Sequence, residues 1–459
     1  MPSRLAPART LNNGTHPTLR QYTVCPGCLH VRPITRTPYH IRTSPYSPAR
    51  TRNQSSWAQA VSTAQNVFSS VGKNDDTFAG TNVDPLRIVG KEMKFLTKNI
   101  QQLLGSGHPI LDTVAKYYTK SEGKHVRPML VLLMSRATSH TAKAPQRTPV
   151  PSASTVNCPI SPPSVLSDRN PLFQADHPLS ASSIDTGYAN ANSDILPSQR
   201  RLAEITELIH TASLLHDDVI DNSISRRSSP SANISFGNKM AVLAGDFLLG
   251  RASVALARLR DAEVVELLAT VIANLVEGEF MQLKNTALDE AKPEWTEDTL
   301  SYYLQKTYLK SASLISKSCR AAALLSQNTP EVVEAAYSYG KNLGLAFQLV
   351  DDMLDYTISG AELGKPAGAD LELGLATAPL LFAWKDNKEL GVLVGRKFSA
   401  EGDVETARDM VARSTGLEQT RALAQEYADK AVYAISGFPD CEAKQGLIEM
   451  CTKTMKRRK

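Results

Sequence analysis

Hydrophobic residues recur every three or four positions over long stretches of this chain, which is the spacing of amphipathic helices. Alternation of the kind found in strands is nearly absent, so the pattern predicts an all-α fold built as one large helical bundle. The predicted helices cover about 86–107, 108–124, 127–138, 201–222, 236–259, 261–287, 297–325, 331–356, 374–386, 403–414 and 418–437.

The helical pattern is broken at about 139–197, where the chain is rich in Ser, Pro, Thr, Ala and Asn. Such segments bury too little apolar surface to fold and are typical of disordered loops. Closing a long loop costs little, because the entropy cost grows only with the logarithm of its length. We expect a passive insertion within a single helical domain at 76–459, with a regulatory or docking role as the alternative.

One acidic pattern occurs twice, each time at the end of an apolar helical run. Its aspartates are Asp217, Asp218 and Asp221 in the first motif and Asp351, Asp352 and Asp355 in the second. Residues i and i+4 share a helix face, where like charges repel unless a cation binds between them. Mg²⁺ prefers oxygen ligands and combines one or two carboxylates with waters and phosphate oxygens. The spacing therefore predicts Mg²⁺ sites beside a diphosphate.

Short basic motifs accompany both acidic motifs. They contain Lys124, Arg127, Arg226, Arg227, Lys306, Lys310 and Lys365. Arginine binds diphosphate as a bidentate fork and lysine binds it as a point charge. Each of these residues alone would more often be a solvated charge, but together with the acidic motifs they predict a pocket for two diphosphate groups.

Composition and charge indicate where in the cell the protein is located. With 459 residues, 42% hydrophobic and 21% charged, the chain is typical of a globular protein, and no uninterrupted apolar run reaches the roughly 18 residues of a membrane span. Eight arginines and one lysine precede the first acidic residue, Asp75, so the net charge of +5 is concentrated at the N-terminus. Such a leader, at 1–75, is typical of a mitochondrial transit peptide. A disordered basic tail is the alternative, and no nucleic-acid partner is expected because the remainder is acidic.

The cysteines add no site. Six cysteines without regular spacing do not indicate a disulfide scaffold and favour a reducing compartment. Cys25 and Cys28 form a lone CxxC in the leader, where a zinc or redox site would need a second ligand pair or a βαβ setting. We interpret this pair as incidental.

Taken together, the motifs resemble those of the trans-polyprenyl diphosphate synthases, which have the class I isoprenoid synthase fold. The resemblance runs from about Leu86 to the C-terminus, apart from the insertion, and segments 105–109 and 373–379 look most like the mitochondrial long-chain enzymes. The matching motifs are GKxxRP at 123–128, HxxxxxxDDxxD at 210–221 followed by RR, GDFLL at 245–249, GExxQL at 278–283, KT at 306–307, FQLVDDxLD at 347–355 and GKPxGADL at 364–371.

The resemblance implies an enzyme that adds isopentenyl diphosphate repeatedly to an allylic diphosphate such as farnesyl or geranylgeranyl diphosphate. The allylic diphosphate ionises to a carbocation, the double bond of isopentenyl diphosphate attacks it, and the released pyrophosphate accepts the proton. About three Mg²⁺ ions would stabilise the leaving diphosphate in each active site. The long all-trans product would become the ubiquinone side chain in the mitochondrial matrix, where the enzyme would associate with the inner membrane.

The resemblance also implies roles for individual residues. Asp217, Asp221 and Asp351 should bind Mg²⁺ directly, with Asp218, Asp352 and Asp355 acting through water or a neighbouring ligand. The allylic diphosphate should be bound by Arg226, Lys306 and Lys365. Isopentenyl diphosphate should be bound by Lys124, Arg127, His210 and Arg227. Thr307 and Gln348 should steady the carbocation and the pyrophosphate.

Ala212 and Ser213, just before the first motif, lie where short-chain enzymes of this family carry a large aromatic floor. Because small residues leave room between helices, the resemblance implies a long product of about six to ten isoprene units, although close helix packing would explain them equally. Two positions depart from the family pattern. Ser228 follows the two arginines in place of Gly, and Leu375 replaces a Lys, which removes one cationic contact.

Three alternatives were weighed against this interpretation. Ala212 disfavours a short-chain geranylgeranyl diphosphate synthase, and the second DDxxD motif disfavours a terpene cyclase. The six intact motif aspartates disfavour a non-catalytic subunit of a synthase complex. The resemblance implies a homodimer, with a hetero-oligomer as the alternative. A product of this length is too apolar for water, so release at a membrane surface is expected.

Overall fold

The computed structural model describes residues 83–106, 108–119, 125–145, 156, 194–226, 229–286, 293–357 and 368–457. The predicted transit peptide at 1–75, the CxxC pair and most of the predicted insertion lie outside these residues. Three predicted diphosphate ligands also lie outside them: Lys124, Arg227 and Lys365.

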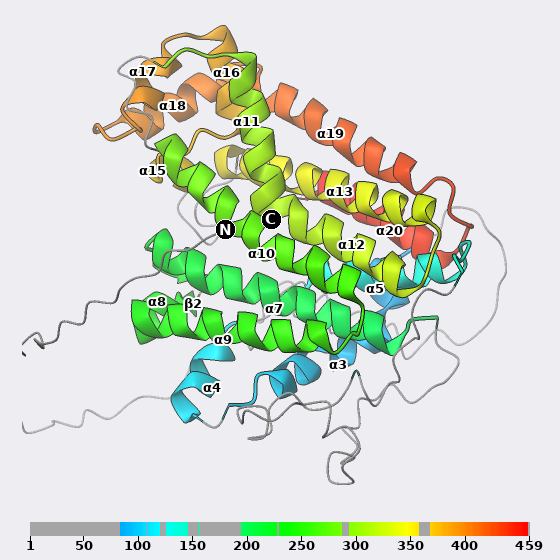
Figure 1. Ribbon diagram of the computed structural model, residues 1–459. Coiled ribbons are helices and arrows are strands. Elements are labelled where there is room, and N and C mark those ends of the chain that lie inside the picture. Colours follow the sequence, from blue (N-terminus) through cyan, green and yellow to red (C-terminus); the bar gives the residue numbers. More distant parts are fainter. Residues whose placement is uncertain are drawn as a thin grey trace, which may run out of the picture. The chain divides into compact units, whose positions relative to one another are not determined.

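The described chain is almost entirely helical, which confirms the predicted all-α fold (Figure 1). The helices are α2 (Pro85–Ile88), α3 (Gly90–Leu103), α4 (Pro109–Ala115), α5 (Val126–Ser139), α7 (Pro197–Ile220), α8 (Ala232–Phe236), α9 (Asn238–Ala257), α10 (Ala262–Thr286), α11 (Glu297–Thr307), the π-helix η4 (Tyr308–Ala312), α12 (Ser313–Leu325), α13 (Pro330–Thr357), α15 (Ala369–Glu372), α16 (Ala378–Asp386), α17 (Leu390–Gly395), α18 (Asp403–Ala412), α19 (Gly416–Ala434) and α20 (Glu442–Met455). Strands β1 (Ser225–Arg226) and β2 (Ser229–Pro230) form one short antiparallel pair.

Most long helices lie close to their predicted positions, and the differences have local causes. The helix predicted at 108–124 ends at Ala115, because the following tyrosines turn away to contact α7 and the loop before α8. The helix predicted at 297–325 is interrupted by η4. Helices α8, α15, α17 and α20 were not predicted.

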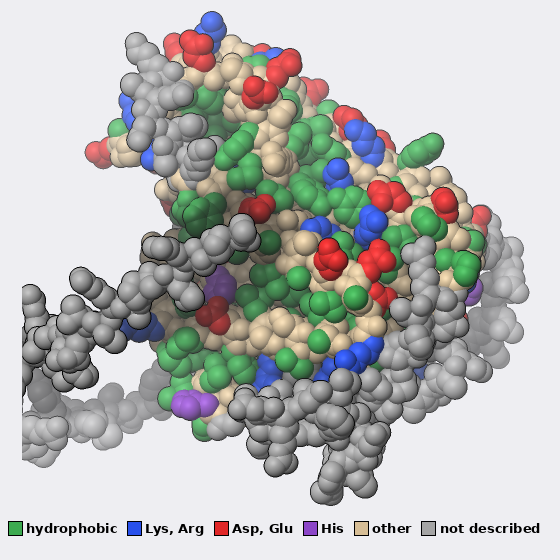
Figure 2. All heavy atoms as spheres, viewed as in Figure 1, with side chains coloured by type: hydrophobic (Ala, Val, Ile, Leu, Met, Phe, Trp, Pro, Cys, Tyr) green, Lys and Arg blue, Asp and Glu red, His purple; other side chains and the backbone are tan. Residues whose placement is uncertain are grey.

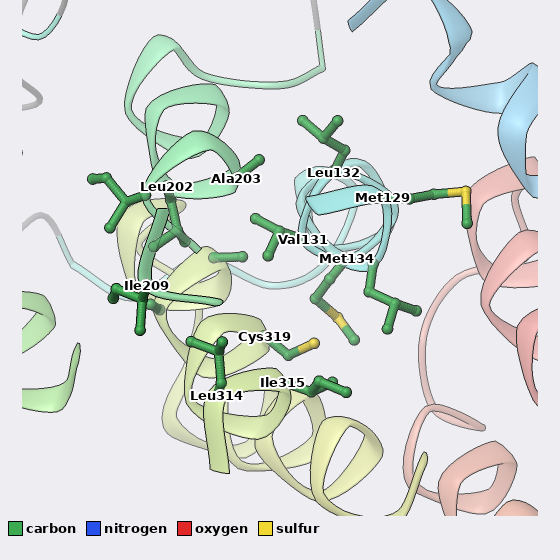
Figure 3. Close-up of a cluster of buried hydrophobic side chains, with 14 of the residues drawn as sticks. Met129, Val131, Leu132, Met134, Leu202, Ala203, Ile209, Leu314, Ile315 and Cys319 are labelled. Atoms are coloured by element: carbon green, nitrogen blue, oxygen red, sulfur yellow. The ribbon is translucent and has the colours of Figure 1, made fainter. Parts of the chain in front are cut away.

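The largest core cluster joins α5, α7 and α12 (Figure 3). Helix α5 is apolar around its whole circumference, and all six residues from Met129 to Met134 are buried. A helix of this kind is stable only when surrounded by other helices. Ala203 of α7 lies on the side toward α5, and Leu202 and Ile209 of α7 and Leu314 of α12 belong to the same cluster. Each such side chain contributes about 1.5–3 kcal/mol on burial, so this cluster fixes α7 firmly in the bundle.

A second cluster surrounds the C-terminal half of α13. It joins Leu349 and Val350 of α13 to Tyr303 of α11 and Trp384 of α16. The second acidic motif lies on α13 directly after these residues, so this cluster positions it.

The start of the predicted insertion is held against the bundle. Lys143 forms an isolated β-bridge with Asn328, in the turn between α12 and α13. The Asn328 amide donates hydrogen bonds to the Thr138 carbonyl (3.0 Å) and the Thr141 hydroxyl (2.6 Å). Val156, within the predicted insertion, is buried and belongs to the main core. The insertion is therefore anchored at its first residues and at one internal position.

Among the described helices, only α9 is long and apolar enough to cross a membrane, judged by length and composition. Of its apolar 18-residue stretch, 44% is buried inside the protein. It packs closely on α7, because a Cβ at Gly245 would lie only 2.2 Å from Nε2 of His216. It also carries Asp246 and the buried Arg251. We interpret α9 as a bundle helix.

Candidate active site

The two acidic motifs lie at the C-terminal ends of α7 and α13 and border one pocket of about 200 Å³. Figure 2 shows the molecule hollowed on this side, between α15 and α8. The pocket is lined by Asp221, Gln282, Tyr303, Lys306, Thr307, Lys310, Ser311, Gln348, Asp352, Asp370, Leu373, Leu375 and Thr377. Leu375, which replaces a lysine of the family pattern, is thus a pocket residue.

The first motif divides its aspartates between two functions. Asp218 is completely buried and accepts hydrogen bonds from the Tyr118 hydroxyl and from Nε of Arg226 (2.7 Å). Tyr118 in turn accepts a hydrogen bond from the Ala232 amide (2.9 Å). Asp218 therefore ties Arg226 and the start of α8 to α7. The carboxylates of Asp217 and Asp221 form no hydrogen bond or ion pair with any described residue, so their oxygens are available to a ligand.

Negative charge is concentrated beside these two carboxylates. Burial raises the pKa of Asp217 to about 6; Lys310 opposes this shift, whereas Glu279 and Asp221 add to it. Burial also raises the pKa of Asp221, again opposed by Lys310 and reinforced by Glu279. A cation that binds here would relieve this repulsion.

The second motif is similarly divided. Asp352 is buried and accepts hydrogen bonds from the Tyr303 hydroxyl (2.5 Å) and the Gln348 amide (2.8 Å). Burial raises its pKa to about 6, against the effect of these two hydrogen bonds. Asp355 is also buried and accepts a hydrogen bond from the Asp370 amide (3.2 Å), which ties the start of α15 to α13.

Asp351 is the most accessible of these three aspartates, with 33% of its side chain exposed. It forms an ion pair with Arg457, which follows α20 at the C-terminal end of the described chain. The Arg457 guanidinium lies 4.5 Å from the centre of the Phe347 ring, a cation–π contact that holds it in place. The Arg457 guanidinium therefore already neutralises the Asp351 carboxylate.

The donor set fits Mg²⁺ better than a metal held by protein alone. No group of three or more His, Cys, Asp or Glu side chains within the described residues could hold a metal ion by itself. Mg²⁺ typically keeps several waters and uses one or two carboxylates together with substrate phosphate oxygens. Asp217 and Asp221, which make no hydrogen bond or ion pair with a described residue, offer such a pair of carboxylates beside the pocket. Asp351 would have to exchange Arg457 for the ion.

Lys306 and Thr307 are both buried and both line the pocket, as predicted for a binding role. Burial lowers the pKa of Lys306, against the charges of Asp352 and Asp370. Its ammonium lies 5.5 Å from the centre of the Tyr303 ring. The predicted pair thus faces the second acidic motif.

A second pair, Lys310 and Ser311, lies on η4; Lys310 was among the basic residues expected near the diphosphates but had no individual role, and Ser311 was not predicted. Both line the same pocket, and Lys310 forms an ion pair with Glu279 of α10. The Ser311 hydroxyl donates a hydrogen bond to Oε1 of Gln348 (2.8 Å). The signal was present: Lys-Ser at 310–311 repeats Lys-Thr at 306–307 one helical turn later.

Two predicted isopentenyl diphosphate ligands come together outside the pocket lining. Arg127 of α5 and His210 of α7 lie 3.0 Å apart, between Nη1 and Nε2. Nearby, Nδ1 of His125 lies 2.9 Å from Glu207. Burial disfavours the charged form of Glu207, but the hydrogen bond from His125 and the charges of His210, His125 and Arg127 together lower its pKa to about 2. This cluster can bind an anion only if its positive charges outnumber the single negative charge of Glu207.

The two predicted chain-length residues differ in their surroundings. Ala212 is completely buried in the main core cluster. Ser213 is partly exposed, and its hydroxyl donates a hydrogen bond to the His210 carbonyl (2.9 Å).

Comparisons with known proteins agree with this site. The sequence model of the polyprenyl synthetase family matches residues 179–411. The chain is 68% identical to a probable mitochondrial hexaprenyl pyrophosphate synthase of Neurospora crassa, covering 89% of this chain and 90% of that protein. It is 46% identical to subunit 1 of decaprenyl-diphosphate synthase of Schizosaccharomyces pombe, covering 85% and 96%.

A crystal structure of a polyprenyl synthase from Caulobacter crescentus, complexed with calcium and isoprenyl diphosphate, superposes with a TM-score of 0.65 at 28% identity. It covers 84% of this chain and 100% of that one. These matches confirm the class I isoprenoid synthase fold and the mitochondrial location expected from the leader. The chain therefore belongs to the polyprenyl synthetase family and is a trans-prenyltransferase that makes polyprenyl diphosphates.

Proposed function

We propose that this enzyme extends farnesyl or geranylgeranyl diphosphate with isopentenyl diphosphate, in a Mg²⁺-dependent reaction, to a hexaprenyl diphosphate destined for the ubiquinone side chain. The carrying observation is a pocket lined by Asp221 of the first acidic motif and Asp352 of the second, together with Lys306 and Lys310. The 68% identity to a probable hexaprenyl synthase supports the product length.

In the proposed reaction the C–O bond of the allylic diphosphate breaks and leaves an allylic cation and pyrophosphate. The double bond of isopentenyl diphosphate then forms the new C–C bond, and the departing proton goes to the pyrophosphate. Lys306 and Lys310 would hold the diphosphate as negative charge develops on it, and such preorganised charge is usually a large part of catalysis. Bound Mg²⁺ would supply further positive charge to the same oxygens.

The hydrogen-bonded pair Ser311 and Gln348 would add oriented dipoles on the cation side. Ser311 donates to Gln348, and Gln348 donates to Asp352, so the Gln348 amide is fixed in one orientation. Thr307, buried beside the same pocket, is the third member of this polar wall. Arg226, held by Asp218, would reach the allylic diphosphate from the α7 side, and Lys365 would approach it from the segment after α13.

Isopentenyl diphosphate would bind at the α5–α7 cluster. Arg127 and His210 already lie within hydrogen-bond distance of each other. In the sequence, Lys124 lies three residues before Arg127, and Arg227 directly follows Arg226. The negative charges of a diphosphate would neutralise these positive side chains better than the single carboxylate of Glu207 does.

We also propose that the enzyme is a homodimer formed through α9 and α10. Apolar side chains are exposed along both helices: Val242, Leu243, Val276, Phe280 and Leu283. In Figure 2 hydrophobic side chains gather over these helices. Exposed apolar patches of this kind mark interaction surfaces. The Schizosaccharomyces pombe relative is named as a subunit, which keeps a hetero-oligomer as the second candidate.

The decisive experiment is to incubate the purified protein with Mg²⁺, farnesyl diphosphate and labelled isopentenyl diphosphate and to chromatograph the products. We expect a dominant product of about six isoprene units, since small residues leave room for a long chain. A matched Asp217→Asn variant should lose activity, as should native enzyme treated with EDTA. A product that stops at four units would favour a geranylgeranyl diphosphate synthase, and an inactive protein would favour the non-catalytic subunit.

A further inference from the structure

We propose that Glu279 is a positioning residue of this active site: it holds the Lys310 ammonium away from Asp217 and Asp221, so that a divalent metal and not Lys310 takes those carboxylates. This inference rests on the proposed function, because it concerns the metal site of the same reaction. Glu279 belongs to the GExxQL motif, to which sequence analysis assigned no role.

The position of Lys310 depends on the π-helix η4. A π turn inserts an extra residue into a helix and changes the direction of the side chains that follow, and such turns are frequent at functional sites. This turn is clamped from both sides. A Cβ at Gly278 of α10 would lie 3.0 Å from the Lys310 amide nitrogen, and a Cβ at Gly344 of α13 would lie 2.7 Å from Cα of Ala312. Lys310 therefore leaves its helix at a fixed place, directly opposite the residue that follows Gly278.

The residue after Gly278 is Glu279, whose side chain is only 10% exposed. Within the described part of the chain its carboxylate receives no hydrogen bond, and its sole ion-pair partner is Lys310. Burying a carboxylate with so little compensation is costly. A role in the neighbouring active site would explain why the Glu279 carboxylate is buried there.

Lys310 has a choice of partners. Lys310 and Asp221 line the same pocket, yet the Lys310 ammonium pairs with Glu279 and with neither aspartate of the first motif's ligand face. Without Glu279, the nearest compensation for Lys310 would be the first acidic motif. An ammonium bound there would compete directly with a divalent metal. Glu279 thus keeps the cation near the diphosphate pocket while leaving the metal ligands accessible.

The test is a double-mutant cycle with Mn²⁺ as the probe, measured by electron paramagnetic resonance on full-length protein in the absence of substrate. The variants are Glu279→Gln, Lys310→Met and the double variant. We expect Glu279→Gln to weaken Mn²⁺ binding about tenfold in the native background and less than about twofold in the Lys310→Met background, because interacting residues couple in such cycles. Glu279→Asp, which keeps the charge, should recover most of the affinity. Thermal denaturation identifies any variant that does not fold.

Equal losses from Glu279→Gln in both backgrounds would overturn the inference, because Glu279 would then act on the metal by itself. No loss in either background would also overturn it. Asp217→Asn distinguishes these results from failure of the proposed function. If this variant binds Mn²⁺ as tightly as the native protein, the metal site itself is misassigned; if it binds weakly while the cycle is additive, only the role of Glu279 fails.

Discussion

Adjacent aspartates of one motif have different functions because successive helical residues point about 100° apart. Asp221 lines the pocket and Asp217 lies one helical turn before it on the same face, whereas Asp218 is bonded to Tyr118 and Arg226. The same division recurs in the second motif, where Asp352 is bonded to Tyr303 and Gln348 and Asp351 remains more accessible. The sequence pattern alone could not separate ligand from support, because all three residues are aspartate.

The raised pKa of Asp217 predicts a pH-dependent stability in metal-free protein. In the unfolded chain this carboxyl titrates near 3.8, and in the fold near 6, so its ionisation destabilises the fold as the pH rises through this range. Asp217→Asn removes that penalty. At pH 7.5 in EDTA we expect the variant to be about 1–3 kcal/mol more stable than the native protein, with the difference shrinking as the pH falls towards 5.

Urea unfolding at a series of pH values measures this difference. Added Mg²⁺ should reverse the order of stability, because it binds the native fold of the unmodified protein only. A stability difference that stays constant between pH 5 and 7.5 would show that Asp217 is not the titrating group.

Ala212 and Ser213 predict how product length is set. Ser213 is partly exposed and Ala212 is buried in the core. Because Ser213 is not fully enclosed, Ser213→Phe should shorten the product by several units at a stability cost of about 1 kcal/mol or less. Ala212→Phe should shorten it as well, but should cost about 1–3 kcal/mol because it overpacks the core. Product chromatography and thermal denaturation measure the two effects separately; unchanged product length in both variants would remove these residues from length control.

At the scale of helices, the sequence predicted what depends on periodicity and missed what depends on packing. Helices α7, α9, α10, α13 and α19 begin and end within about four residues of their predicted bounds. The π turn of η4 has no periodic signature, because it is imposed by close contacts with α10 and α13. As a result, individual roles were predicted for Lys306 and Thr307, whereas Lys310 was predicted only as one of several basic residues and Ser311 was not predicted. The ion pair between Arg457 and Asp351 was also unpredictable, since α20 itself was not recognised and the two residues are far apart in the chain.

The clamp on η4 leads to a prediction for Gly344. A methyl group there would lie 2.7 Å from both Cα and Cβ of Ala312, so α13 would have to move away from the π turn. Gln348 lies one helical turn further along α13 and would lose its fixed distance to Ser311. Gly344→Ala should therefore destabilise the protein by about 1–3 kcal/mol and lower kcat more than KM.

Thermal denaturation and steady-state kinetics test this expectation. Gly90→Ala is the matched control, because nothing lies within 4 Å of a Cβ at that helical position. It should stabilise the fold by about 0.4–1 kcal/mol without changing kcat. Equal behaviour of the two variants would show that the clamp is unimportant.

At the scale of the whole enzyme, the active site is assembled from segments that span most of the described chain. Tyr118 and Arg457, near its two ends, contact opposite acidic motifs. The bundle must therefore fold as a unit before either metal site has its final geometry. The apolar faces of α9 and α10 remain exposed after this assembly, although α10 also carries Glu279 of the active site.

Covering those faces with a second copy would bury side chains that are costly to leave in water, and a stable dimer typically buries about 1,200–2,000 Å² or more. Leu243 is 57% exposed and Phe280 is 69% exposed. A glutamate at either position would place a charge in the dimer interface, so Leu243→Glu and Phe280→Glu should convert a dimer into a monomer. Val392→Glu on α17, which is 58% exposed in the native protein, is the matched control and should remain dimeric. Light scattering coupled to size-exclusion chromatography measures the mass; a native monomer that dimerises only with a second kind of chain would replace the homodimer by the hetero-oligomer.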